Sequence, residues 1–379
     1  MGVFDSLMKK KIVVGILLLA TVAFGKKEEP DYKAYILGDS KGNIYYEYND
    51  ETKLPLASVT KMMNILVVFD EIHKGNVHLN DVVTVDWEAV SAGGSSIPMK
   101  SGEQFYLVDL IKAAAIKSAN NAAYAMAKYV GGGSTEHFVE MMNKKAKELG
   151  LEKELEFHTP AGLPTHMTKK PMDMGTAKGI YELSLHAIKY NDYMEIAGIP
   201  KTTIKDGEIS LKSTNHLLGK NGVFGIKTGY HTRAGFNMSV ASTEENITTV
   251  TVVLGGKSIK IRDNKILELM EKFHNKYKNK EITNKNISLV TIPVKNGIQS
   301  EVSIYPNKNF SSIITEKSDV RIDMDRDSYI EAPVLPGTVV GNYNVYIDNK
   351  KVFTDKLIVK DSIEKKNLIQ SLKEKFIKN

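Results

Sequence analysis

The chain has 379 residues, which is enough for more than one domain, and 25% of them are charged. The formal net charge of +6 is modest for this length, and no clustered stripe of basic and aromatic residues occurs, so nucleic-acid binding is not indicated. The absence of cysteine excludes thiol catalysis and thiolate metal sites. The nine histidines form no H-E-x-x-H pattern, and we expect neither a metal site nor a cofactor.

Residues 1–25 have the features of a secretory signal peptide. Three lysines at positions 9–11 precede the apolar run 12–24, which is too short for a comfortable membrane span. Cleavage after either Ala23 or Gly25 fits the small residues found before a cleavage site, and an uncleaved N-terminal anchor is the alternative. We therefore expect export to the outer face of the cytoplasmic membrane, in the periplasm or the cell-wall space.

A nucleophile pattern, S-x-x-K, occurs at Ser58 and Lys61. Apolar residues at helical spacing follow it as far as Gly75, so a helix that begins near Ser58 would place Ser58 and Lys61 on one face, one turn apart. The ordinary role of a serine at such a place is that of a helix N-cap. The pattern alone is weak evidence, because it also occurs at Ser6 and Ser362.

Two further strings follow, S-x-N at 118–120 and K-T-G at 227–229. S-x-N also occurs at 213–215, but we expect that copy to lie too close to Lys227 to form a separate wall of a pocket. K-T-G occurs once. The three strings in this order, with room for folded structure between them, are typical of an acyl-transferring serine enzyme whose base is a lysine.

The chemistry of such a site assigns a role to each side chain. A free lysine, with a pKa near ~10.4, is protonated at neutral pH, so burial and a second cation must lower the pKa of Lys61 before it can act as general base for the nucleophile Ser58. Lys227 is the obvious second cation, and it must stay charged to hold a substrate anion. Ser118 is suited to relay the proton to the leaving amine, and the Asn120 amide either binds a substrate peptide group or orients Lys61.

The K-T-G string suits the recognition of negative charge. Lys227 and Thr228 can hold a substrate carboxylate by charge and by hydroxyl donation, and Gly229 lets a backbone approach closely. The segment 235–254 is rich in Val and Thr and is predicted to be a strand. A strand edge at the K-T-G string would offer a backbone N–H to an oxyanion, together with the N–H of Ser58.

The chain divides into segments of different pattern. Residues 26–275 mix helical and strand patterns and hold all three strings, so we predict an α/β catalytic domain with an antiparallel sheet flanked by helices. The Lys- and Asn-rich stretch 276–286 is predicted to be a linker. From 287 to 360, short alternating runs separated by turn signals predict a small all-β domain.

The C-terminal segment 361–379 is predicted to be a basic amphipathic helix. Its apolar face is formed by Leu368, Ile369, Leu372 and Phe376, and most of its lysines lie elsewhere. Such a helix is typical of a peptide that lies on an anionic membrane surface. The alternative is a helix that packs on the β domain or frays.

The chain resembles the low-molecular-mass penicillin-binding proteins of the D-alanyl-D-alanine carboxypeptidase family. Besides the three strings, the segments that carry the resemblance are 54–62, 94–97, 102–103, 109–110, 159–164 and 225–230. The match is strong over residues 32–275 and rests on layout alone elsewhere. It implies a fold like that of the DD-peptidases and serine β-lactamases, makes Tyr230 the second backbone donor of the oxyanion hole, and suggests that Arg262 helps to hold the substrate carboxylate.

The resemblance implies a serine-type DD-carboxypeptidase of peptidoglycan biosynthesis and cell-shape maintenance. Ser58 would attack the carbonyl of the penultimate D-alanine of a stem peptide, the terminal D-alanine would leave, and water would release the acyl-enzyme. β-Lactams would mimic the substrate and trap Ser58. An endopeptidase that cleaves crosslinks is a variant of the same activity.

Two alternatives belong to other functional classes. A serine β-lactamase shares the three strings, but no E-x-x-L-N occurs between the second and the third, and the additional β domain argues against this alternative. A penicillin-binding sensor or wall-binding module with little turnover would be acylated without hydrolysing peptides.

Overall fold

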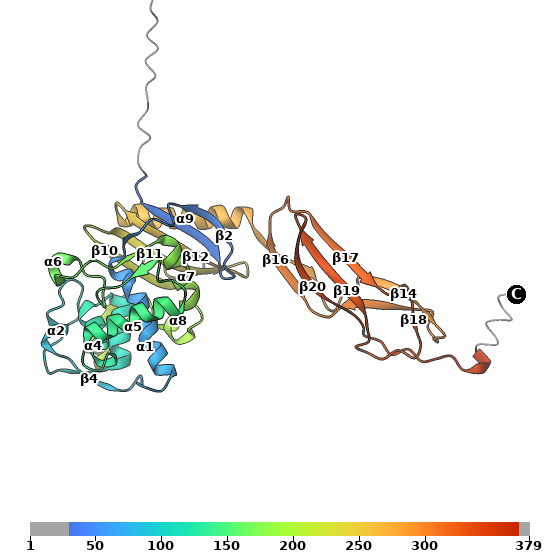
Figure 1. Ribbon diagram of the computed structural model, residues 1–379, viewed down its shortest axis with the longest axis horizontal. Coiled ribbons are helices and arrows are strands. Elements are labelled where there is room, and N and C mark those ends of the chain that lie inside the picture. The colour runs from blue at the N-terminus through green and yellow to red at the C-terminus, as the bar shows by residue number, and fades with distance from the viewer. Residues whose placement is uncertain (1–29, 371–379) are drawn as a thin grey trace, which may run out of the picture. The chain divides into compact units, whose positions relative to one another are not determined.

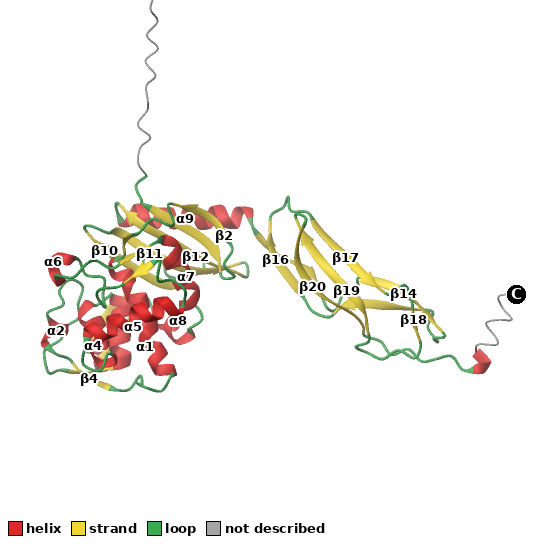
Figure 2. Ribbon diagram, viewed as in Figure 1, coloured by secondary structure: helices red, strands yellow, loops and turns green. Residues whose placement is uncertain are grey.

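The computed structural model describes residues 30–370, which form an α/β domain (residues 31–276) and an all-β domain (residues 278–366, the β domain) (Figures 1 and 2). Both were predicted from the sequence, and the predicted fold class is confirmed. The predicted signal peptide lies outside the described residues. No helix within 30–370 is long and apolar enough to cross a membrane.

The α/β domain is built on a five-stranded antiparallel sheet with the order β10-β11-β12-β1-β2. The strands are β1 Ala34–Asp39, β2 Ile44–Tyr48, β10 Val223–His231, β11 Gly235–Glu244 and β12 Ile247–Gly256. The segment 235–254, predicted to be one strand, is a hairpin of β11 and β12. Glu245 and Asn246 turn the chain between them with φ of 50° and 60°, the left-handed backbone that tight hairpin turns require.

Helices cover both faces of this sheet (Figure 1). Side chains alternate along each strand, so Ile36 and Val252 face the larger core, while Leu37 and Val253 face the core under α9. The helices of the domain are α1 Lys61–His73, α2 Trp87–Val90, α3 Leu107–Lys112, α4 Asn120–Val130, α5 Thr135–Glu148, α6 Thr165–Thr168, α7 Ala177–Ala187, α8 Asn191–Ala197 and α9 Ile259–Lys276.

Helix α1 is the central helix of the larger core. Its first nine residues, 61–69, are all buried, because α4, α5 and α7 pack around it. Three short turns complete the helical structure, the 3-10 helices η1 Ala57–Thr60 and η3 Lys205–Gly207 and the π-helix η2 Ala113–Lys117. The short strands are β3 Leu54–Pro55, β4 Val82–Thr84, β5 Gln104–Tyr106, β6 Leu155–Glu156, β7 Met174–Gly175, β8 Lys201–Ile204 and β9 Ile209–Lys212.

The β domain contains a six-stranded sheet of order β17-β19-β20-β15-β14-β18 and the pair β13-β16. Its strands are β13 Lys278–Thr283, β14 Val290–Lys295, β15 Glu301–Pro306, β16 Phe310–Ile314, β17 Val320–Arg326, β18 Ile330–Glu331, β19 Val339–Ile347 and β20 Lys350–Val359. A separate apolar core holds it together, with Ile304, Tyr343 and Leu357 fully buried.

The prediction that 276–286 is a linker is wrong in part. Strand β13 lies inside that stretch and pairs antiparallel with β16, with Lys280 opposite Ser312. Its Lys and Asn side chains are mostly exposed and only Thr283 is buried, so the segment lacks the apolar alternation by which a strand is recognised.

The predicted C-terminal helix also begins later than expected. Residues 361–366 are extended rather than helical, because Ile363 pairs with Val334 and fills the core of the β domain, and Lys365 pairs with Gly297. Helical structure begins at Leu368. The part of the prediction that falls on 371–379 lies outside the described residues.

Candidate active site

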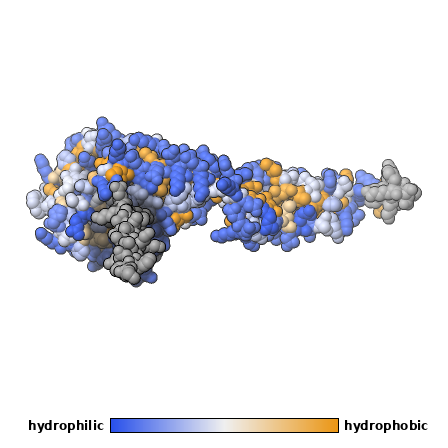
Figure 3. All heavy atoms as spheres, turned by 90° about the horizontal axis from the view of Figure 1, so that it is seen from above, coloured by the Kyte–Doolittle hydropathy of each residue, from blue (hydrophilic) through white to orange (hydrophobic). Residues whose placement is uncertain are grey.

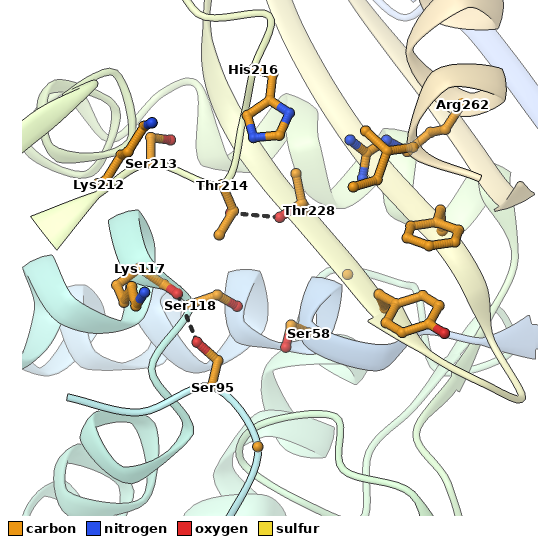
Figure 4. Close-up of a pocket in the computed structure, with 15 residues that line it drawn as sticks. Ser58, Ser95, Lys117, Ser118, Lys212, Ser213, Thr214, His216, Thr228 and Arg262 are labelled. Atoms are coloured by element: carbon orange, nitrogen blue, oxygen red, sulfur yellow. Dashed lines mark hydrogen bonds between the residues drawn. The ribbon is translucent and has the colours of Figure 1, made fainter.

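The three strings meet at one cavity of about 610 Å³ in the α/β domain (Figure 4). In Figure 4, Ser58 and Ser118 lie on one side of the cavity, and Thr214 and Thr228 face them from the other. Of the predicted site residues, those that line it are Ser58, Ser118, Thr228, Gly229, Tyr230 and Arg262. The other three, Lys61, Asn120 and Lys227, are buried in the wall behind it and bond to one another or to the lining residues.

Ser58 lies in the 3-10 turn that leads into α1. Ala57, just before it, has φ of 50°, a left-handed conformation that is strained for a residue with a Cβ atom. The hydroxyl caps no helix, since neither helical start in this segment has a side-chain cap, and Ser58 Oγ instead lies 2.8 Å from Lys61 Nζ. The segment therefore presents the hydroxyl to the cavity rather than to the helix backbone.

Lys61 has the most enclosed amine of the site. Its side chain is fully buried, and Nζ lies 2.8 Å from Ser58 Oγ, 2.6 Å from Asn120 Oδ1 and 2.9 Å from the carbonyl oxygen of Ala161. Burial, and then the charge of Lys227, lower the pKa of Lys61 well below its ordinary value. A neutral amine here would donate to the two acceptor-only oxygens and accept the proton of the Ser58 hydroxyl.

Ser118 and Lys227 form the second pair. Lys227 Nζ donates to Ser118 Oγ at 2.8 Å and to the carbonyl oxygen of Thr228 at 3.0 Å. Ser118 has φ of 62°, so it is a second strained residue with a Cβ atom at the cavity. Burial, with a smaller contribution from the charge of Arg262, lowers the pKa of Lys227 to about 7.

The Asn120 amide is occupied by protein partners. Its oxygen accepts from Lys61, and its Nδ2 donates to the carbonyl oxygen of Gly93 at 2.7 Å. The backbone N–H of Asn120 also donates to Ser95, so Asn120 ties the 93–95 loop to the base of the site. Of the two roles considered from the sequence, these bonds favour the orientation of Lys61.

Strand β10 is the edge strand of the sheet and lies against the nucleophile. A Cβ atom added to Gly229 would come within 2.9 Å of the Leu56 carbonyl oxygen and 3.1 Å of the Ser58 backbone nitrogen, so only glycine allows this approach. Asn237 on β11 fixes the contact from behind, because its Nδ2 donates to the carbonyl oxygens of Pro55 and Leu56. The sequence argument missed Asn237, although a polar residue within a Val-rich strand is an unusual choice.

A buried carboxylate, Asp173, organises the loop that supports Lys61. It accepts from the backbone N–H groups of His158 and Thr159 and from the hydroxyls of Thr159 and Thr60. Burial raises the pKa of Asp173. The bonds hold the 159–163 loop in place, and the Ala161 carbonyl of that loop contacts Lys61. The sequence argument missed Asp173 because a single aspartate in a segment rich in Met and Lys carries no pattern.

The stretch 213–216 lines the cavity on the same side as Thr228 and forms no separate wall, but it belongs to the site, a part that was not predicted for it. Ser213, Thr214 and His216 all line the cavity, and the hydroxyls of Thr214 and Thr228 lie 2.6 Å apart. The chain folds back before β10 and so places this stretch beside Thr228.

Arg262 at the start of α9 lines the same cavity, with its side chain almost fully buried. Its guanidinium pairs with Asp263 at 2.7 Å and approaches the carbonyl oxygen of Asn237 at 3.5 Å. Within residues 30–370, no group of His, Cys, Asp and Glu side chains could hold a metal ion.

Comparisons with known proteins agree with this geometry. Residues 23–258 match the family described as D-alanyl-D-alanine carboxypeptidase, and residues 277–365 match the C-terminal domain of penicillin-binding protein 5. The chain belongs to the D-alanyl-D-alanine carboxypeptidase family. The predicted family and the predicted class of enzyme, a serine-type carboxypeptidase, are thereby confirmed.

Curated relatives match over nearly the whole chain. D-alanyl-D-alanine carboxypeptidase DacF of Bacillus subtilis is 28% identical and covers 96% of both chains. D-alanyl-D-alanine carboxypeptidase DacC of Escherichia coli is 30% identical and covers 92% of this chain and 90% of its own. The similarity to these carboxypeptidases therefore extends over both domains of this chain.

Solved structures show the same fold. Penicillin-binding protein 5 of Haemophilus influenzae matches with a TM-score of 0.66 at 24% identity, over 89% of this chain and 98% of its own. Penicillin-binding protein D2 of Listeria monocytogenes, in an ampicillin-bound form, matches with a TM-score of 0.55 at 25% identity, over 64% of this chain and 97% of its own.

Proposed function

We propose that this chain removes the terminal D-alanine from peptidoglycan stem peptides through an acyl-enzyme on Ser58. The observation that carries this proposal is the pair of contacts between serine and lysine, Ser58 with Lys61 and Ser118 with Lys227, at one cavity. The reaction needs a base beside the nucleophile, which Lys61 can supply, and a positive charge to bind the substrate carboxylate, which Lys227 can supply.

Lys61 is the general base in this proposal. Burial and the neighbouring cation hold it in the neutral form, and the 2.8 Å contact with Ser58 Oγ allows direct proton transfer. Asn120 is the residue that orients Lys61. The leaving amine needs a proton, and Ser118 relays to it the proton that Lys61 took from Ser58, while the bond from the Lys227 ammonium holds the Ser118 hydroxyl in place.

Lys227 and Thr228 take the substrate carboxylate, with Arg262 as an additional source of positive charge. In the free protein the pKa of Lys227 is about 7, so roughly half of the molecules would carry the charge at neutral pH. A bound carboxylate favours the ammonium form, so substrate binding itself would complete the protonation of Lys227.

The backbone N–H groups of Ser58 and Tyr230 form the oxyanion hole in this proposal. The support is the close approach of Gly229 to the Ser58 nitrogen, which brings β10 beside the first turn of the nucleophile helix. Donors fixed by a strand and a helical turn need no reorganisation when the tetrahedral intermediate forms, which is how such sites stabilise charge.

The test is the intact mass of the protein 26–379 over time after mixing with benzylpenicillin, beside a Ser58→Ala control. We expect a long-lived adduct of one drug molecule that the variant lacks, and release of D-alanine from an N-acylated peptide ending in D-Ala-D-Ala. An adduct without peptide hydrolysis would favour the sensor alternative. The absence of any adduct would refute the central proposal.

We further propose that the signal peptide 1–25 directs export, that 26–275 is the catalytic domain, and that the C-terminal segment 361–379 binds the outer face of the cytoplasmic membrane. Exposed apolar side chains support membrane contact, since Leu368 is 81% and Ile369 67% exposed. The face of the β domain seen in Figure 3 also carries hydrophobic residues among hydrophilic ones.

Membrane contact can be tested by sedimentation with vesicles that contain phosphatidylglycerol. We expect the protein 26–379 to sediment with them and a Leu368→Ser/Ile369→Ser variant to stay in solution. Ile287→Ser is the matched control, because Ile287 is an apolar residue of similar exposure. It lies before β14, whereas residues 361–366 contact the 296–299 loop that follows β14. Equal binding of both variants would remove these residues from the contact.

A further inference from the structure

The cavity around Ser58 has an apolar wall that the reaction steps above do not use. The rings of Tyr230 and Phe236 stack with their centroids 4.2 Å apart and an interplanar angle of 23°. Both line the cavity, and so does Ile259. Tyr230 is nevertheless 55% exposed, so one ring of the pair is available to a ligand.

The position of this pair along β10 relates it to the catalytic groups. Tyr230 is two residues beyond Thr228, so both side chains project from the same face of the strand, about 6.6 to 6.8 Å apart along it. Phe236 is the cross-strand partner of Tyr230 on β11, which fixes the two rings relative to the sheet. The apolar pair therefore lies at a defined distance from the carboxylate site.

A substrate that pairs with an edge strand extends the sheet by one strand. Since β10 is the edge, an antiparallel substrate with its C-terminal carboxylate at Thr228 would run back past Tyr230. The residue that precedes D-Ala-D-Ala would then lie over the stacked rings. This placement rests on the proposed function, which puts the carboxylate at Thr228.

The charged residues of the cavity limit which side chains this subsite can bind. Among the described residues that line it, the charged ones are Lys117, Lys212 and Arg262, and none is an aspartate or a glutamate. A side chain that ends in an ammonium group would find no carboxylate partner there. Binding energy must therefore come from the apolar part of the side chain, in contact with the rings.

We propose that Tyr230 and Phe236 form a subsite for the side chain of the residue before D-Ala-D-Ala, and that it recognises an unbranched aliphatic stem rather than a terminal charge. The same surface would take the apolar acyl substituent of a β-lactam. A longer stem buries more apolar area against the rings, which strengthens binding on the acyl side of the scissile bond.

The test compares three Nα-acetyl tripeptides, X-D-Ala-D-Ala with X as L-alanine, L-norleucine or L-lysine, by release of D-alanine from the protein 26–379. Norleucine has three more methylene groups than alanine, so we expect kcat/KM to be about tenfold higher for norleucine, with lysine no better than norleucine. Tyr230→Ala should abolish the preference for norleucine over alanine, whereas Tyr230→Phe, which keeps the ring, should retain it.

Each other outcome has a distinct meaning. Equal kcat/KM for alanine and norleucine in the wild type, or an unchanged preference in Tyr230→Ala, would overturn the subsite. A large advantage of lysine over norleucine would show a partner for the ammonium and also overturn it. Failure of the proposed function is separate, because then none of the three peptides would be hydrolysed, whether or not benzylpenicillin forms an adduct with Ser58. Adduct formation by Tyr230→Ala would show that this variant still assembles the site.

Discussion

The α/β domain and the β domain differ in how many polar and charged side chains they bury. The α/β domain buries four charged side chains at one cavity or close behind its wall, Lys61, Asp173, Lys227 and Arg262. Among the described residues of the β domain, the one buried polar residue is Thr283, and its core is otherwise apolar. A buried charge lowers the stability of the fold unless it is paired and hydrogen-bonded. The concentration of buried charges in the α/β domain therefore marks the domain that carries out the reaction.

Backbone strain follows the same division. Around the cavity, Ala57 and Ser118 have left-handed backbones, a conformation that is strained for residues with a Cβ atom. In the described β domain, the non-glycine residues with positive φ are Asn296, Asp348 and Asn349, for which this conformation costs little. The comparison indicates that substitutions in one domain should change chemistry, and those in the other should change stability.

The largest effect is expected at Lys61. Lys61→Met removes the amine 2.8 Å from Ser58 Oγ, and the rate of acylation by benzylpenicillin should fall about 10²- to 10⁴-fold, which is the usual contribution of a general base. Lys144→Met, at an exposed position on α5, is the matched control and should acylate like the wild type. The rate is measured by intact mass, and a circular dichroism spectrum checks the fold. A Lys61→Met rate close to that of the wild type would exclude this lysine as the base.

The opposite result is expected in the core of the β domain. Leu357→Ala empties a fully buried position in contact with the core of β15 and β19, and should lower the free energy of unfolding by about 2–5 kcal/mol without changing the acylation rate. The exposed Val352→Ala should change it by less than about 0.5 kcal/mol. Urea unfolding measures both. Slower acylation by Leu357→Ala under native conditions would show that the two domains are coupled, and would weaken the division drawn here.

Features that depend on residues close together in the sequence were predictable, and features that depend on distant segments were not. The S-x-x-K, S-x-N and K-T-G strings identified Ser58, Ser118 and Lys227, because each residue type is needed at a fixed spacing. The two-domain layout followed from a change in periodicity near 287. The sequence did not indicate β13, whose pairing with β16 depends on backbone hydrogen bonds rather than apolar side chains.

The supporting residues were missed for a different reason. Asp173 and Asn237 act through bonds to backbone groups in other segments of the chain, at Thr159 and at Leu56. Only the folded chain brings these groups together. Thr214 belongs to the S-x-N copy at 213–215, which was not expected to form a separate wall; its contact with Thr228 shows that it lines the cavity all the same. Site residues that belong to a sequence motif are therefore more predictable than the residues that hold the motif in position.

Asp173 should give a smaller, mixed effect, since it supports the site without lining the cavity. Asp173→Ala leaves the N–H groups of His158 and Thr159 without their acceptor, which should cost about 1–3 kcal/mol of stability. The freed loop carries the Ala161 carbonyl that holds Lys61, so acylation should also slow, by about tenfold on the same energy scale. Asp173→Asn keeps an acceptor oxygen and should lose less of both. Loss of stability at an unchanged acylation rate would confine Asp173 to folding.

The effect most specific to the buried lysines is a slope of the free energy of unfolding with pH. The pKa of Lys227 is about 7 in the folded protein and near ~10.4 in the unfolded chain, so between these values the unfolded chain binds more protons. The free energy of unfolding of the α/β domain should therefore rise with pH in this window, by at most about 1.4 kcal/mol per pH unit for one group, and show no slope from Lys227 below it.

Urea unfolding at about pH 7 and pH 9 measures the rise, and Lys227→Met should reduce it. The β domain buries no lysine among its described residues, so its own transition is the internal control. An equal slope in wild type and variant would mean that Lys227 is protonated throughout, and that its charge in the free site needs no substrate.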